Sequence, residues 1–360
     1  MHATVYVYKE KLRHNLKTLT DLSYDCSLIA VVKANAYGLG AVGVSKAIEA
    51  EEKLSAFAVT TADEALELRR AGIKKPILIL LPILPNRIKE VIENDITPSI
   101  HSIENLKDIS SFLIAAGKAA DVHLKIDTGM NRWGIKLEEL DEFINFYKQV
   151  SNVNIKGFYS HISDKNSAPF QIDRFDRVIE KLKENNIDPE MVHISSSSTV
   201  MQGLKSEYAT DIRIGLALYG IDPFDLSLKL EPSFEFTSYI LMIKHIKKGE
   251  TVGYNGTWSA PVDTTVAIIP IGYEDGIMRT LSNKSSVLIN QKRAFLVGTV
   301  SMDAIIVNIN GIDAELYDKV TIIGRNGEKS ITAWNLAKLA GTIPYEIMTG
   351  IGNRAERIYI

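Results

Sequence analysis

The hydrophobic positions in the first two-thirds of the chain form short apolar runs that are separated by helical patterns. Eight such runs can be distinguished, at residues 27–33, 56–60, 77–81, 96–100, 122–127, 155–161, 191–195 and 212–218. They are apolar throughout rather than alternating, which is typical of parallel strands that are buried on both faces. Eight strands with helices between them predict a parallel (β/α)8 barrel of the TIM type.

The segments between these runs carry helix signals of their own. Thr61 stands three residues before Glu64, which is the spacing of a capping box, and Gly72 follows as a stop signal. Residues 136–150 and 170–186 repeat apolar side chains at intervals of three and four on a charged background. We expect these segments to form helices of the outer ring of the barrel.

The pattern changes near residue 233. From there to the end, short apolar runs are separated by Gly, Asn and Asp turn residues, with one helix expected at residues 332–340. The sequence therefore predicts a barrel of residues 1–232 and a mainly antiparallel β domain of residues 233–360. A ninth apolar run within residues 1–8 is surplus to the barrel and is a candidate to pair with the β domain.

Composition narrows the range of functions. The 360 residues include 41 Lys and Arg against 44 Asp and Glu, without a basic stripe, which argues against a nucleic-acid partner. The single cysteine, Cys26, excludes a disulfide framework and a Cys-rich metal site and fits a reducing compartment. The longest apolar run, residues 76–85, is broken by prolines and falls short of the roughly 20 residues that span a bilayer. We expect a cytoplasmic protein with no membrane contact by this chain and no metal.

The first apolar run ends in Lys33. A lysine buried among apolar residues tends to lose its proton, which makes its amine a nucleophile, and barrel enzymes carry catalytic groups at the ends of their strands. The alternative for this residue alone is a lysine whose side chain reaches solvent at the rim of the barrel.

A glycine pattern follows the same run. Gly38, Gly40 and Gly43 form a G-x-G-x-x-G motif, with Asp63 at the distance of a ribose-binding acid. In a dinucleotide-binding fold the first glycine follows the strand directly, whereas here residues 33–37 intervene. This spacing argues against a dinucleotide site.

Polar residues also end the later runs, and their positions predict one shared site. Each has a structural alternative, such as a core histidine, a helix-capping serine or a rim lysine. Together they suit an anionic cofactor with a reactive aldehyde, because hydroxyl and glycine backbone groups near the last strands can hold a phosphate while a lysine binds the aldehyde. This combination points to pyridoxal 5'-phosphate (PLP). The residues concerned are Lys125, Asp127, His161, His193, residues 195–199, Arg213 and Gly215.

Four segments of the chain resemble the signatures of alanine racemases. They read VVKANAYG at residues 31–38, KIDTGMNR at 125–132, RIGLALYG at 213–220 and GYEDG at 272–276. They follow the order found in that family and extend over nearly the whole chain. The resemblance implies a PLP-binding barrel followed by a β domain, a small amino-acid substrate, and a head-to-tail homodimer with shared active sites.

The same resemblance implies two catalytic bases. Lys33 corresponds to the Schiff-base lysine, which also acts on the D-enantiomer, and Tyr273 to the base that acts on the L-enantiomer in the partner's site. Racemisation needs acid and base groups on opposite faces of a planar carbanion, which agrees with this pair. A tyrosine has a reference pKa of about 10, so nearby positive charge must favour its phenolate.

Other family positions carry over residue by residue. Arg213 matches the arginine at the pyridine nitrogen, where related decarboxylases carry a carboxylate, and His161 is its neighbour. Because arginine keeps its proton, it should leave that nitrogen unprotonated. Lys125 matches a lysine that is carbamylated in some members. The phosphate contacts correspond to Tyr37, Ser197, Gly215 and Leu216, and the substrate contacts to Arg132 and Met302.

Asn353 departs from the family pattern. Typical alanine racemases have a tyrosine there that lines the pocket and touches the phosphate, whereas an asparagine leaves room and a hydrogen-bond partner for a hydroxyl. Asparagine here resembles the serine racemase domains of vancomycin-resistance systems, in which the racemase domain follows a membrane-spanning portion. We therefore expect a racemase of serine and/or alanine that supplies cell-wall precursors, and the chain could be the cytoplasmic domain of a longer membrane protein.

Two alternatives stay open at this point. One is an ordinary alanine racemase without serine preference. The other is a non-catalytic PLP-binding barrel of the vitamin-homeostasis type. Proteins of that type have no β domain and lack the Tyr273 motif, so the last third of the chain argues against this reading.

Overall fold

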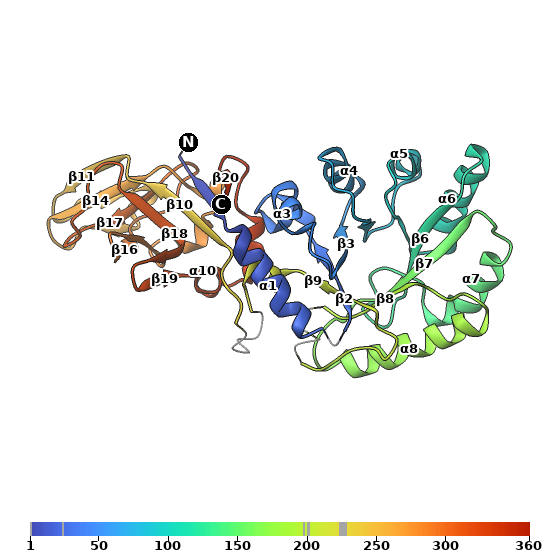
Figure 1. The fold of residues 1–360 in the computed structure, drawn as a ribbon. Helices are drawn as coiled ribbons and strands as arrows, with labels where there is room; N and C mark the ends of the chain where they lie inside the picture. The colour runs from blue at the N-terminus through green and yellow to red at the C-terminus, as the bar shows by residue number, and fades with distance from the viewer. Residues whose placement is uncertain (1, 24, 197–198, 200–201, 223–228) are drawn as a thin grey trace. The chain divides into compact units, whose positions relative to one another are not determined.

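The chain divides into two structural units, neither of which is a single stretch of sequence. The computed structural model describes residues 2–23, 25–196, 199, 202–222 and 229–360 (Figure 1). The barrel unit comprises Glu10–Ala36 and Ala41–Glu231. The β unit comprises Met1–Lys9, Tyr37–Gly40 and Pro232–Ile360.

The barrel unit is built on eight parallel strands in two hydrogen-bonded sheets, ordered β9-β2-β3-β4 and β5-β6-β7-β8. Parallel bridges between Leu78 and Thr97 and between Ser196 and Arg213 join the sheets at both edges and complete the ring. The eight predicted strands and the barrel are thereby confirmed. The strands are β2 (Ser27–Val31), β3 (Leu54–Val59), β4 (Ile77–Ile79), β5 (Ser99–Ile100), β6 (Ala120–Lys125), β7 (Val153–Tyr159), β8 (Met191–His193) and β9 (Asp211–Ile214).

Helices α3 to α8 lie outside these strands (Figure 1). The predicted capping box is present, with the Thr61 hydroxyl accepting from the Glu64 N–H at the start of α4. The two amphipathic segments form α7 and α8, which bury their apolar stripes toward the strands. The helices are α3 (Ala41–Ile48), α4 (Ala62–Arg70), α5 (Ile88–Glu93), α6 (Ile103–Ala116), α7 (Leu140–Tyr147) and α8 (Ala168–Glu184).

Strands β2 and β9 end earlier than the apolar runs that predicted them. Strand β2 ends before Lys33, which instead begins a helical turn. Strand β9 ends before Gly215, whose φ of −122° and ψ of −104° interrupt the extended backbone, and a 3-10 turn follows at Leu216–Tyr219. Both changes occur at the carboxyl ends of strands, where the predicted site residues lie.

The β unit contains one large sheet in the order β11-β14-β17-β16-β15-β18-β10-β1-β20, with β19 paired to β18. Its neighbouring strands are antiparallel except for β1 and β20, which confirms the mainly antiparallel prediction. Strand β1 also pairs with β10. The bounds are β1 (Thr4–Val7), β10 (Phe234–Tyr239), β11 (Met242–Ile246), β14 (Thr264–Ile269), β15 (Ser286–Ile289), β16 (Lys292–Leu296), β17 (Ile305–Asn308), β18 (Lys319–Asn326), β19 (Lys329–Ile331) and β20 (Glu356–Tyr359).

A short piece of the barrel sequence, Tyr37–Gly40, belongs to the β unit. The Arg357 side chain donates to the carbonyl of Gly38 from Nε at 3.1 Å and from Nη2 at 2.9 Å. The Tyr359 hydroxyl donates to the carbonyl of Leu39 at 3.0 Å, and the Leu39 side chain is fully buried. The residues that follow Lys33 are therefore fixed to strand β20, which the sequence pattern did not predict.

The described residues bear on three expectations from composition, which concern membrane spans, metal ligands and the single cysteine. None of the helices described is long and apolar enough to cross a membrane. No group of three or more His, Cys, Asp or Glu side chains in the described part of the chain is arranged to hold a metal ion. The thiol of Cys26 is buried and donates to the carbonyl of Ala209 at 3.2 Å, and burial raises its pKa.

Candidate active site

Lys33 follows strand β2 and is the first residue of a left-handed turn, α2 (Lys33–Tyr37). The four residues after it, none of which is glycine, have φ angles between 50° and 55°. Residues with side chains disfavour this conformation by about 1–2 kcal/mol each, so surrounding contacts must hold it. The N–H of Ala34 donates to Glu64 Oε1 at 2.7 Å, while Glu64 Oε2 accepts from the N–H of Thr61. One carboxylate thus caps α4 and holds the turn.

The amine of Lys33 is partly buried, and its pKa is lowered. Burial is the largest cause, followed by the positive charge of Arg132, while Glu64 acts in the opposite direction and Arg213 adds to the decrease. A lowered pKa increases the fraction of neutral amine at neutral pH, which is the form that acts as a nucleophile or a base.

Arg213 lies on β9, and its guanidinium is buried among neutral acceptors. Nη2 donates to the carbonyls of Ser160 at 2.6 Å and Ile194 at 3.1 Å and to His161 Nδ1 at 3.4 Å. Nη1 donates to the carbonyl of His193 at 2.5 Å and to its Nδ1 at 2.7 Å. Burial lowers the pKa of Arg213 to about 10, so the group is still protonated at neutral pH.

The contacts of Arg213 determine the protonation of two further histidines. Arginine can only donate, so His193 Nδ1 must accept and the proton of this neutral ring must be on Nε2. His193 Nε2 lies 3.0 Å from His123 Nδ1, which therefore accepts in turn. Burial, together with the charge of Arg213, lowers the pKa of His123 to about 3 and that of His193 well below its usual value. Both rings are thus neutral, and their orientations depend on the arginine.

Lys125, at the end of β6, is a second buried amine. Its Nζ lies 5.0 Å from the centre of the Tyr159 ring, while the guanidinium carbon of Arg213 lies 5.6 Å from the same ring. Tyr159 is uncharged, since burial raises its pKa and its hydroxyl donates to the carbonyl of Leu80 at 3.0 Å. Burial and then the charge of Arg213 hold the pKa of Lys125 well below its usual range. A lowered pKa increases the fraction of Lys125 that is a neutral amine, which is the form that reacts with an electrophile.

The loop after β6 places Arg132. The carboxylate of Asp127 is buried, and its Oδ1 accepts from the N–H groups of Gly129 at 3.0 Å and Asn131 at 3.1 Å. These bonds fold the loop so that Arg132, whose side chain is exposed, contributes positive charge at both Lys33 and Lys125.

His161 shows that these residues gather in one place. Burial is the largest cause that lowers its pKa to about 3, and the charges of Arg213, Lys125, Arg132 and Lys33 all act in the same direction. Five of the residues selected from the sequence therefore share one electrostatic environment with an excess of positive charge. Such a site favours an anionic ligand.

The predicted phosphate contacts fall into three groups. Gly215 and Leu216 begin the 3-10 turn directly after β9. Tyr37 ends the left-handed turn within the β unit, where its buried ring lies 5.8 Å from that of Tyr345. Ser197 lies outside the described residues.

The β unit brings together Tyr273, Met302 and Asn353. The N–H of the residue after Tyr273 donates to the carbonyl of Met302 at 3.2 Å. The residue before Asn353 donates its N–H to the carbonyl of Asp275 at 3.4 Å. The side chains of Tyr273 and Met302 are 43% and 50% exposed, and Asn353 is exposed as well. The three residues thus lie on adjoining turns with their side chains available for contacts outside the unit.

Three residues near the barrel cluster were not selected from the sequence. His123 and Tyr159 stand two positions before Lys125 and His161, so alternation along each strand could have placed each pair on one face. His101 follows β5; its ring is buried, and neither of its nitrogens has a hydrogen-bond partner among the described residues. No sequence motif marks these residues, because their contacts come from other strands.

Comparisons with known proteins cover almost the whole chain. Residues 7–223 match the family model "Alanine racemase, N-terminal domain", and residues 233–359 match "Alanine racemase, C-terminal domain". An alanine racemase of Carboxydothermus hydrogenoformans is 36% identical over 98% of this chain and 97% of its own length. A solved structure of alanine racemase from Clostridium difficile 630 superposes with a TM-score of 0.93 at 32% identity, covering 100% of this chain and 96% of that one.

Another similar solved structure is that of a racemase named for a different amino acid. Histidine racemase from Leuconostoc mesenteroides superposes with a TM-score of 0.91 at 26% identity, covering 100% of this chain and 98% of that one. The fold is therefore shared by racemases of different specificity. The comparisons do not show the resemblance to the serine racemase domains of vancomycin-resistance systems, so that interpretation stays a prediction.

The buried ring of His101 gives a prediction for stability. Burial and then the charge of Lys125 lower its pKa to about 3, against about 6.5 in the unfolded chain. Between these values the unfolded chain binds the extra proton, so the free energy of unfolding falls as the pH falls from 6.5 toward 3. In His101→Phe, we expect urea denaturation to show a pH slope that is smaller by about 1.4 kcal/mol per pH unit.

Phenylalanine preserves the edge-on ring contacts of His101 with Trp133 and Tyr159. The matched control is His245→Gln, at an exposed position of the β unit, which should leave the slope unchanged. An unaltered slope in His101→Phe would show that His101 is not held neutral by the fold.

Proposed function

Because the chain belongs to the alanine racemase family, we propose that it is a PLP-dependent racemase that interconverts the L- and D-enantiomers of alanine and/or serine. The family is PLP-dependent. The observation that carries the proposal is the barrel cluster, in which Lys33 has a lowered pKa beside Arg213 and its neutral acceptors. In this proposal the D-enantiomer supplies cell-wall precursors.

The residues of the cluster fit PLP. Its excess positive charge suits a phosphorylated cofactor, and the lowered pKa of Lys33 suits covalent attachment to an aldehyde. When bound, PLP withdraws electrons from the α carbon of the substrate and so makes the loss of its proton possible. Lys33 would hold the aldehyde carbon and Arg213 the ring nitrogen. The phosphate would be held by Tyr37, Ser197, Gly215 and Leu216.

Two residues act as the proton carriers in this proposal. Lys33 Nζ exchanges the α-proton of the D-enantiomer, and the phenolic oxygen of Tyr273 exchanges that of the L-enantiomer from the opposite face. Tyr273 acts in the site of the partner subunit, so the active enzyme is a homodimer. Arg132 binds the substrate carboxylate, and Met302 contributes a backbone contact. The exposed side chains of Tyr273 and Met302 support a role outside their own unit.

Arg213 determines the outcome of the reaction. With a pKa of about 10 it remains a hydrogen-bond donor at neutral pH, so a ring nitrogen facing it must accept and stays unprotonated. This would limit the electron withdrawal that bound PLP supplies and would favour return of the α-proton over side reactions. His161 and His193 support this role, because both are neutral acceptors for the guanidinium.

The reaction itself can be tested directly. We expect the purified protein to bind PLP and to show a visible absorbance band that borohydride abolishes, leaving the cofactor attached to Lys33 in peptide mass spectra. In D₂O the holoenzyme should exchange the α-proton of both enantiomers of alanine. Lys33→Ala should lose both properties, and the exposed control Lys292→Ala should lose neither. Cofactor binding without exchange would support the non-catalytic barrel, and no binding would contradict the proposal.

The preference for serine rests on Asn353. An exposed amide can donate to or accept from a substrate hydroxyl, whereas the tyrosine of typical family members fills this space. We expect Asn353→Tyr to lower kcat/KM for L-serine relative to L-alanine by roughly tenfold, about the value of one hydrogen bond. Asn353→Ala separates the loss of the amide from the loss of space. A wide preference for alanine, with serine turnover unchanged in Asn353→Tyr, would leave an ordinary alanine racemase.

Lys125 is proposed as a site of carbamylation. Its amine is buried and has a lowered pKa, which favours the neutral form that adds to CO₂. The addition forms an N–C bond and releases one proton, and the resulting anion would offset the charges of Arg213 and Arg132. Protein equilibrated with ¹³C-bicarbonate should show a carbamate carbon signal by NMR. Lys125→Met should lack this signal, and the exposed control Lys292→Met should retain it. A spectrum without the signal at neutral pH would contradict the modification.

A further inference from the structure

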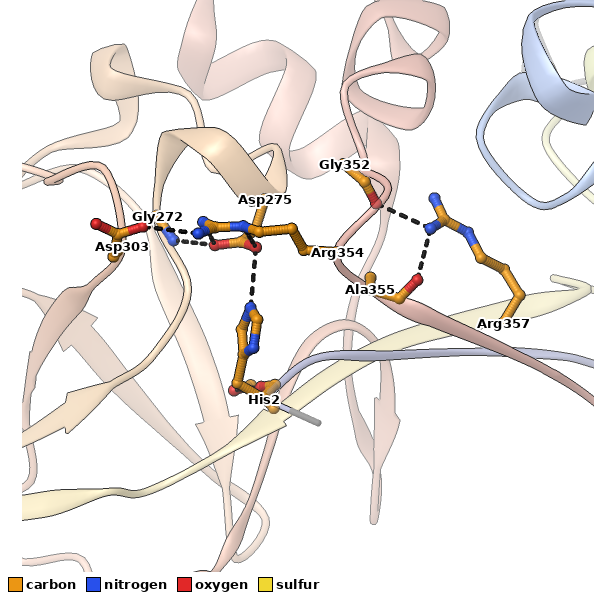
Figure 2. Close-up of polar contacts among 9 residues, drawn as sticks. His2, Gly272, Asp275, Asp303, Gly352, Arg354, Ala355 and Arg357 are labelled. Atoms are coloured by element: carbon orange, nitrogen blue, oxygen red, sulfur yellow. Dashed lines mark hydrogen bonds and ion pairs between the residues drawn. The ribbon is translucent and has the colours of Figure 1, made fainter.

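Asp275 is a fully buried carboxylate two residues after Tyr273 (Figure 2). Its Oδ2 accepts from the N–H of Gly272 at 2.8 Å and from Arg354 Nη2 at 2.9 Å. Its Oδ1 accepts from Arg354 Nε at 3.1 Å and lies 3.3 Å from His2 Nε2. A buried carboxylate is tolerated only when it is paired and hydrogen-bonded, and removal of one partner of such a pair is strongly destabilising locally. The turn from Gly272 to Asp275 is therefore fixed to Arg354.

Arg354 connects this turn to the other two predicted site residues of the β unit. It is the residue after Asn353, and its Nη1 donates to Asp303 Oδ1 at 2.8 Å. Asp303 is the residue after Met302. The two carboxylates lie on different sides of one guanidinium (Figure 2), so a single side chain holds three loops together.

The backbone shows how little freedom these loops have. Gly272 cannot carry a side chain, because a Cβ there would lie 2.2 Å from the carbonyl oxygen of Met302. Gly276 has a φ of +100°, and a Cβ there would lie 2.5 Å from the carbonyl oxygen of Gly350. The N–H of Tyr273 donates to the carbonyl of Ser301 at 3.0 Å.

The side chain of Tyr273, by contrast, has no anchor of its own. It is 43% exposed, and its hydroxyl makes no hydrogen bond to the described residues of the chain. Its direction is therefore set by the backbone of the turn. The conformation of this segment, Gly272 to Asp275, depends on the interactions of Asp275.

We propose that Asp275 and Arg354 are positioning residues for Tyr273, so that proton transfer on the Tyr273 face of the substrate depends on this ion pair. The inference rests on the proposed racemase function. Its consequence is an asymmetry, because only one of the two proton carriers lies on the turn. Lys33 belongs to the barrel unit and makes none of these contacts.

The asymmetry can be measured as the initial rate of α-deuterium incorporation from each enantiomer in D₂O. In Asp275→Asn, a misplaced Tyr273 should slow exchange from L-alanine by roughly a hundredfold, the scale expected for a displacement of about 1 Å. Exchange from D-alanine with retention of configuration needs only Lys33 and should change by less than about threefold. Arg354→Ala should slow exchange from L-alanine to a similar extent, and Arg354→Lys should retain part of the L-alanine exchange rate that Arg354→Ala loses.

A second readout does not require the loaded enzyme. 3-Fluorotyrosine placed at position 273 should give one narrow ¹⁹F resonance in the cofactor-free wild type and a shifted or broadened one in Asp275→Asn and Arg354→Lys. The matched control is Asp263→Asn, which breaks the exposed ion pair with Lys247 in the same unit and should alter neither readout.

The outcomes separate the two proposals. Equal loss of exchange from both enantiomers, or an unchanged ¹⁹F spectrum with unchanged exchange, would overturn the positioning role. A wild type that exchanges neither enantiomer would instead contradict the racemase function, and the ¹⁹F spectra would still test whether the ion pair orders Tyr273.

Discussion

The guanidinium of Arg213 is buried on β9, and its hydrogen bonds to described residues all go to neutral acceptors. This single arrangement sets the electrostatics of the barrel site. It forces His161 and His193 to accept, which keeps both rings neutral, and its charge contributes to the lowered pKa values of Lys33 and Lys125. A carboxylate in place of these acceptors would cancel the charge and return both lysines toward their protonated forms.

The two units handle buried charge in opposite ways. In the β unit, Asp275 is matched by Arg354, His2 and a backbone N–H, so its charge is satisfied within the chain. Such a group holds structure and has no capacity left for a ligand. In the barrel unit, the guanidinium of Arg213 donates only to neutral acceptors among the described residues, so its positive charge still favours an anionic ligand. Whether a buried charge is matched by an opposite charge within the chain therefore distinguishes the positioning cluster around Asp275 from the binding cluster around Arg213.

The barrel, the capped helix α4 and the site residues at strand ends could be predicted from the sequence, because each has a local periodic pattern or motif. The sequence did not predict His123 or Tyr159, whose contacts are made across strands, nor the link between Asp275 and Arg354, which lie 79 residues apart. The motif GYEDG identified Tyr273 as a candidate. Asp275, in the same motif, acts through Arg354, and this contact is made only in the folded chain.

The left-handed turn after Lys33 could not be predicted from the sequence, because Ala and Tyr disfavour positive φ. Its effect on the course of the backbone follows from its geometry. Four residues in an extended strand advance about 13 Å, whereas four residues in a helical turn of either hand advance about 6 Å. The turn therefore shortens the backbone path that follows Lys33 compared with a continued strand. Glu64 accepts a hydrogen bond from the N–H of Ala34, so a carboxylate on α4 helps to hold the left-handed turn.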